Sequence, residues 1–230
     1  MEALNLSEIP VIDEHCHGFY RTQQPADVMV WRRHFTESAD KRMWQEYVPA
    51  TLFYHRLIRE LATFFGCEAT ESAVLDARSR YQPDDLIRTL LQAGNIETLL
   101  IDRGYPAAEL LMPDTDVAAL AGCRVGAFLR LENLMQELIV AHDTLGDVVE
   151  ALRAALADVR AQGYVGLKSI VAYRTGLDIR WWDSSEALDS FAQARQAAVE
   201  QGRLRLQHKP LLDTLLHVAC AEAARQELPV

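Results

Sequence analysis

Short apolar runs that end in polar residues alternate along this chain with longer segments of helical periodicity. Such runs, apolar throughout or alternating with polar residues, are the usual signal of a β-strand. The run at 98–104 is nearly continuous, as in a strand buried on both faces. Alternation at 124–132 instead puts Phe128, Arg130 and Glu132 on one face. The pattern predicts strands at 11–17, 98–104, 124–132 and 164–173.

Helical spacing and boundary residues predict the segments that follow these strands. Asp183 to Glu186 has the pattern of a capping box, and Gly202 gives the expected stop of that helix. Pro210 suits the first turn of a last helix. Strands that alternate with helices predict parallel βαβ units. The helices expected after the second strand lie near 146–162, 186–201 and 210–227.

The stretch from 19 to 94 contains no clear strand signal. Leu57, Leu61 and Phe64 fall on one helical stripe, and a second helix is expected at 84–91 between Pro83 and Gly94. We interpret 19–94 as a helical insertion after the first strand, inside one domain that spans 1–230.

The composition suits one folded domain and narrows the classes of function. Half of the residues are hydrophobic, and 23 basic against 33 acidic residues give a net charge of −10. This balance argues against a nucleic-acid partner, which would favour a basic face. No apolar run is long enough to span a membrane, and the first residues lack a signal-peptide pattern.

The cysteines have no paired spacing, which argues against a zinc ribbon and against a disulfide framework. A reducing, cytoplasmic location is therefore expected. Cys16 lies between His15 and His17, but strand alternation turns it to the opposite face. A buried thiol is the preferred reading of Cys16, in place of a metal ligand.

The clearest chemical signal is the stretch Asp13-Glu14-His15-Cys16-His17 at the end of the first predicted strand. Strand alternation puts Asp13, His15 and His17 on one face. Two imidazoles at this spacing can both reach one cation, because a metal needs ligands that converge. The alternative is a pair of polar surface residues after a short strand. We predict that His15 and His17 bind a metal and that Asp13 orients a ligand imidazole or the loop.

Polar residues also lie in or just after the third and fourth predicted strands. Arg130 and Glu132 either contact the substrate and order the site, or form a salt bridge at the rim. Arg174 is predicted to bind an anionic group of the substrate, because a guanidinium matches a carboxylate in a two-point fork. Lys168 stands in an otherwise apolar strand, so its ammonium needs a partner. It either extends to the rim or holds a carboxylate or carbonyl of the substrate.

The Asp13-x-His15-x-His17 pattern resembles the amidohydrolase superfamily. The segments Gly166–Leu177 and Lys209–Leu211 resemble its amidohydrolase-2 branch. The resemblance implies a (β/α)8 TIM barrel of the metal-dependent hydrolase type, of which this chain supplies roughly the first half. Leu228–Val230 would begin the fifth strand, and the remaining metal ligands would follow it.

The resemblance also implies one or two divalent metal ions, with zinc as the first choice. Lys168 matches, by strand order, a lysine that reacts with carbon dioxide in the wider superfamily. The resulting carbamate bridges two metals there, whereas many relatives in the branch carry no carbamate and hold one metal. Both forms of Lys168 remain open, and in either form it is expected in the catalytic site.

Three functions remain open on this basis. The first is hydrolysis of an amide or related C–N or C–O bond in a small molecule by a metal-activated water. The second is non-oxidative decarboxylation with the same metal ligands. The third is a non-catalytic half-barrel that pairs with itself or with another chain. A small-molecule substrate is expected, with no nucleic acid or membrane as partner, and self-association stays open.

Overall fold

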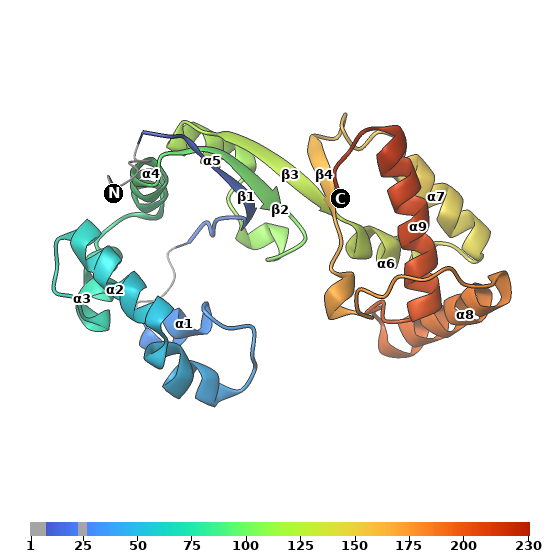
Figure 1. The fold of residues 1–230 in the computed structure, drawn as a ribbon, viewed down its shortest axis with the longest axis horizontal. Coiled ribbons are helices and arrows are strands. Elements are labelled where there is room, and N and C mark those ends of the chain that lie inside the picture. Colours follow the sequence, from blue (N-terminus) through green and yellow to red (C-terminus); the bar gives the residue numbers. More distant parts are fainter. Residues whose placement is uncertain (1–7, 23–26) are drawn as a thin grey trace, which may run out of the picture. The chain divides into compact units, whose positions relative to one another are not determined.

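A computed structural model describes residues 8–22 and 27–230 (Figure 1). The chain divides into two compact units. The first is built mainly from Phe19–Ile96 and Leu110–Gly122. The second consists of Val11–Gly18, Glu97–Glu109 and Cys123–Val230. Nearly all of the sheet and every predicted site residue belong to the second unit.

The second unit is organised around one sheet in the strand order β1-β2-β3-β4. β2 and β3 pair in parallel with Asp102 opposite Phe128, and β3 and β4 pair in parallel with Arg130 opposite Lys168. Parallel neighbours end at the same edge of a sheet, so the residues that close these strands lie side by side. The strands are β1 (Val11–His17), β2 (Ile96–Asp102), β3 (Arg124–Arg130) and β4 (Tyr164–Lys168).

The predicted (β/α)8 TIM barrel, with this chain as its first half, is wrong. The strands in the described part of the chain form one open four-stranded sheet, and β1 and β4 are its two outer members. The architecture is α/β with an open parallel sheet. Successive βαβ units give the same sequence pattern in open and in closed sheets, so periodicity did not separate the two.

Four helices of the second unit surround its main hydrophobic core. Leu131, Met135 and Ile139 are fully buried at helical spacing and start this core directly after β3. Leu167 of β4 packs into the same cluster. These helices and the short turn after β4 are α6 (Leu131–Ala141), α7 (Leu145–Ala157), η4 (Val171–Tyr173), α8 (Ser184–Gln201) and α9 (Lys209–Arg225).

The third and fourth strands end earlier than predicted, and the second, predicted at 98–104, spans Ile96–Asp102. The alternation at 124–132 continues past Arg130, but the chain turns helical at Leu131, so Glu132 lies in the first turn of α6. The fourth strand ends at Lys168 and not at Tyr173. Beside it, the backbone N–H of Leu167 donates to the carbonyl of Pro229 over 2.9 Å. The C-terminal segment, predicted to begin a strand, thus makes one bond with β4.

The first unit is mainly helical. Its helices are α1 (Val28–Arg33), η1 (Met43–Tyr47), η2 (Val48–Ala50), α2 (Leu52–Phe65), α3 (Glu71–Ser79), α4 (Pro83–Ala93) and α5 (Asp114–Ala121). A short turn, η3 (Ala108–Leu110), precedes α5. The 19–94 stretch is thus helical as expected, while its standing as an insertion stays a prediction. No helix in the described part of the chain has the length and apolar character of a membrane span.

A mostly buried ion pair between Arg32 and Glu71 lies in the first unit. Glu71 accepts hydrogen bonds from Arg32 and from the Tyr54 hydroxyl, the latter over 2.6 Å. Both charged side chains are mostly buried, with 14% and 24% of the Arg32 and Glu71 side chains exposed. The bond from Arg32 holds the pKa of Glu71 below its usual value. A lowered carboxyl pKa stabilises the fold above the unfolded-state pKa.

We predict that Glu71→Gln lowers the free energy of unfolding by about 1.5–3 kcal/mol at pH 7, the range of charged hydrogen bonds. The difference from wild type should shrink as the pH falls through the lowered pKa of Glu71, because the wild-type carboxylate is then protonated. Urea unfolding at pH 7 and pH 3 measures both values. Glu60→Gln is the matched control, since its pair with Arg56 is exposed on α2 and should change stability little. A pH-independent loss in Glu71→Gln would contradict this account.

Candidate metal centre

The ends of β1 and β2 bring three potential metal ligands together. His15 and His17 are exposed on β1, and Asp102 is the buried last residue of β2. One ligand atom from each lies within 4.8 Å of the other two. The alternation predicted for β1 thus holds for the two histidines. Cys16 lies apart from this group, with its Sγ 3.7 Å from the Leu100 carbonyl.

Asp102 is the fully buried member of this group, and none of its side chain is exposed. Such a buried carboxylate needs partners for its charge. Its Oδ1 accepts the backbone N–H of Gly104 over 2.8 Å. Its Oδ2 lies 2.5 Å from Arg130 Nη2 and 3.1 Å from Lys168 Nζ. Burial alone would raise the pKa of Asp102, but the bonds from Arg130, Gly104 and Lys168 outweigh it, and the pKa is lowered. These neighbours therefore favour the ionised carboxylate.

The two imidazoles have different surroundings. Their ring centroids are 5.5 Å apart in an edge-to-face arrangement, and Tyr105 lies against His17 in the same way. The backbone N–H of His15 donates to Asp13 Oδ1 over 3.2 Å, which ties Asp13 to the end of β1, and its predicted role beside the ligands stays a prediction. Burial lowers the pKa of His15, and the positive charge of Lys168 lowers it further. Both effects favour the neutral imidazole, the form that binds a metal.

Lys168 ends β4 and contacts two of the three potential ligands. Its Nζ forms a hydrogen bond with His15 Nε2 and an ion pair with Asp102 Oδ2. The ammonium thus lies among the atoms that would receive a metal. The ammonium at the end of this apolar strand needs a partner of opposite charge. The buried carboxylate of Asp102 is that partner.

The donor set fits a divalent cation. Imidazole nitrogen and carboxylate oxygen are both ligands of zinc, bound at about 2.0–2.2 Å, which separates the ligands of a tetrahedral ion by about 3.4 Å. The ligand atoms of the three residues lie within 4.8 Å of one another, so they would have to move closer together to bind such an ion. Three protein ligands are also the number found in catalytic zinc sites.

The other predicted site residues have different partners. Arg130 is committed to Asp102. Glu132 is fully buried and accepts from the Ser169 hydroxyl and the Ile170 backbone N–H, which ties α6 to the loop after β4. Arg174 lies in that loop, partly buried. Substrate contacts by these three residues stay predictions.

Sequence reasoning missed Asp102 as a ligand. The signal was present, because Asp102 and Arg103 end an apolar strand before Gly104. Acidic residues at strand ends are common, however, and only the strand order shows that β2 lies next to β1. The side chain of Asp102 reaches His15 and His17 for that reason.

Comparison with known proteins concerns the fold. A scan against models of protein families and a search of curated proteins found no match. Among solved structures, the chain is similar to a protein of Lactobacillus casei ATCC 334, described as a "putative metal-dependent hydrolase" and determined at 1.40 Å. The TM-score is 0.81 at 24% identity, and the match covers 97% of this chain. It covers 57% of that protein, so this chain spans little more than half its length. The amidohydrolase-2 branch stays a prediction.

We predict that Gly104→Ala disturbs the metal centre. A Cβ at Gly104 would lie 2.5 Å from Arg130 Nε and 2.8 Å from its Cβ, so the guanidinium that holds Asp102 must move. We expect a loss of about 1–3 kcal/mol in the free energy of unfolding, as for other overpacked positions. Urea unfolding measures it. Gly146→Ala is the control, because a Cβ there meets its nearest atom, Thr144 Oγ1, at 3.7 Å. Equal stability of the two variants would contradict this account.

Proposed function

We propose that this protein is a metal-dependent hydrolase of a small molecule, in which His15, His17 and Asp102 hold a divalent cation, with zinc as the first choice. The observation that carries the proposal is the convergence of two imidazoles and one buried carboxylate at the ends of neighbouring strands. The similarity to a solved protein described as a hydrolase of this kind adds support.

The surroundings of Asp102 leave it able to bind a cation. A carboxylate has about four positions for hydrogen bonds or metal, two on each oxygen. Arg130 and Lys168 occupy Oδ2, whereas Gly104 occupies one position on Oδ1. One position on Oδ1 therefore remains for a metal. The bonds of Arg130 and Lys168 to Oδ2 would keep the carboxylate oriented while the metal binds.

His15 Nε2, the atom that Lys168 contacts, has at most one lone pair to give to a metal. A cation bound at this nitrogen would displace the Lys168 ammonium from it. We infer that the ammonium withdraws from His15 and keeps its ion pair with Asp102. A carbamate on Lys168 is the alternative form, in which the side chain would itself offer oxygen ligands.

A bound divalent cation supplies the chemistry of hydrolysis, because it lowers the pKa of a water molecule and polarises a substrate carbonyl. The residues of the chain hold and orient the ligands. Arg130 and Gly104 fix Asp102, and Asp13 fixes the backbone at His15. Lys168, once withdrawn from His15, lies beside the centre with protons to donate to a substrate oxygen.

The first test is the metal itself. We expect His15→Ala and His17→Ala each to lower zinc affinity by at least about 100-fold, since loss of a direct ligand should exceed the 10–100-fold effect of outer partners. Calorimetric titration with zinc and elemental analysis measure the affinity and the stoichiometry. His55→Ala is the control, because His55 is exposed on α2. Unchanged zinc binding in both site variants would remove the proposed function.

A second test asks which form Lys168 takes. If it is an ammonium, Lys168→Met should raise zinc affinity at least about fivefold, because two unit charges 4 Å apart repel by about 1–4 kcal/mol between aqueous and surface dielectric constants. Lys41→Met, at an exposed position, should have no effect. Lower zinc affinity in Lys168→Met, with the mass of one carbon dioxide on wild-type Lys168, would instead establish the carbamate.

A further inference from the structure

The loop after β4 carries an arginine whose polar atoms have few partners. Arg174 follows η4, and its Nε and Nη1 are buried without a hydrogen-bond acceptor among the described residues. The hydroxyl of the next residue, Thr175, is also buried without a partner in that part of the chain. Buried donors of this kind cost free energy unless something accepts from them. A ligand that brings acceptor oxygens would satisfy both residues.

The charges around Arg174 favour an anion. Burial lowers the pKa of its guanidinium, and the charge of Arg205 lowers it further, whereas the carboxylate of Glu132 raises it. Arg130 also acts on Arg174, but Asp102 already neutralises Arg130. The Arg174 guanidinium is thus a cation whose buried Nε and Nη1 have no acceptor among the described residues. An anion would supply both acceptor oxygens and the opposite charge.

The loop that carries Arg174 is fastened at both of its ends. On one side, Glu132 accepts from Ser169 and Ile170. On the other side, the buried carboxylate of Asp213 accepts from the backbone N–H of Arg180 over 3.1 Å and from Trp182 Nε1 over 2.9 Å. The backbone on both sides of Arg174 is thus tied to the helices, which reduces the backbone entropy that ligand binding must lose.

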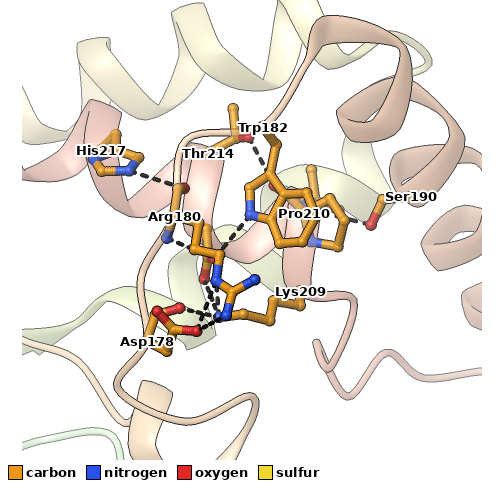
Figure 2. A network of polar contacts seen from close by, with 10 residues as sticks. Asp178, Arg180, Trp182, Ser190, Lys209, Pro210, Thr214 and His217 are labelled. Carbon is orange, nitrogen blue, oxygen red and sulfur yellow. Dashed lines mark hydrogen bonds and ion pairs between the residues drawn. The ribbon is translucent and has the colours of Figure 1, made fainter.

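Lys209 completes the second fastening. Its Nζ lies 3.0 Å from Asp213 Oδ2 and donates to the carbonyl of Asp178. Figure 2 shows Lys209 next to Asp178 and Arg180, with Trp182 on the other side of the network. The Lys209–Leu211 motif therefore has a structural part here, because it fixes the loop that presents Arg174.

The position of Arg174 relates it to the metal centre. Arg130, whose charge acts on Arg174, is bonded directly to the metal-centre residue Asp102. Lys168 of that centre is separated from Arg174 by only five residues of the fastened loop. An anionic group held by Arg174 would keep the remainder of a small molecule near the centre.

We propose that Arg174, with Thr175 and Arg205, binds a carboxylate of the substrate, so that the substrate class is a small carboxylate-bearing molecule. This inference deepens the proposed hydrolase function and rests on it, because the bound molecule is a substrate only if the protein is a hydrolase. Binding of an anion at Arg174 can be measured in the absence of metal. A guanidinium fork fits the two oxygens of a carboxylate.

The test titrates the metal-free full chain with benzoate, and with benzamide as the uncharged analogue of the same shape. We expect benzoate to bind and benzamide to bind at least about tenfold more weakly, the scale of a charge-assisted hydrogen bond. Arg174→Gln should lower benzoate affinity by at least about tenfold, and Arg174→Lys by less, because lysine keeps the charge but not the fork. Arg203→Gln removes the same charge from an exposed neighbour and should have no effect.

Arg205→Gln keeps the test decisive if Arg174→Gln fails to fold, since Arg205 is exposed and outside the core. It should weaken benzoate several-fold. Equal binding of benzoate and benzamide, or unchanged benzoate affinity in both Arg174→Lys and Arg205→Gln, would overturn the proposal. Tighter binding of inorganic phosphate than of benzoate would overturn the choice of carboxylate. Zinc titration of the same variants is a separate readout, so loss of the anion site leaves the metal centre to be judged by itself.

Discussion

The second unit depends on one buried charge, the carboxylate of Asp102. A buried carboxylate is tolerated only when its charge and its hydrogen bonds are compensated. The compensation comes from its own loop through Gly104, from the end of β3 through Arg130 and from the end of β4 through Lys168. Three consecutive strands therefore have to end at the same level. The register that pairs Arg130 with Lys168 provides this alignment.

The same arrangement brings the three candidate ligands together without a metal. Many small metal sites lack this order and unfold when the metal is absent. Here Lys168 supplies a positive charge from inside the chain and contacts His15 as well. The contacts of Lys168 thus hold the candidate ligands together within the chain itself.

The sequence predicted the parts of this site that depend on local pattern. Strand alternation placed His15 and His17 on one face and Cys16 away from them, because side-chain direction in a strand follows from position alone. The capping box at Asp183 is present, since it involves neighbouring residues only. Asp102 and the open sheet were not predicted, because both depend on which strands become neighbours. The start of α6 was missed because alternation from Phe128 to Glu132 continues across the boundary.

Other buried acids of this unit also accept hydrogen bonds that join separate segments. Two of them hold the loop after β4, which follows Lys168 of the candidate metal centre. Glu132 and Asp213 are fully buried, as Asp102 is, and each accepts donors from a segment distant in the sequence. Asp102 joins strand ends, whereas Glu132 and Asp213 hold the two ends of the loop. Glu132 and Asp213 thereby tie the backbone on either side of Arg174 to the helices. Under the proposed function, the buried donors of Arg174 would favour an anionic group over an uncharged one, because hydrogen bonds between charged partners are stronger.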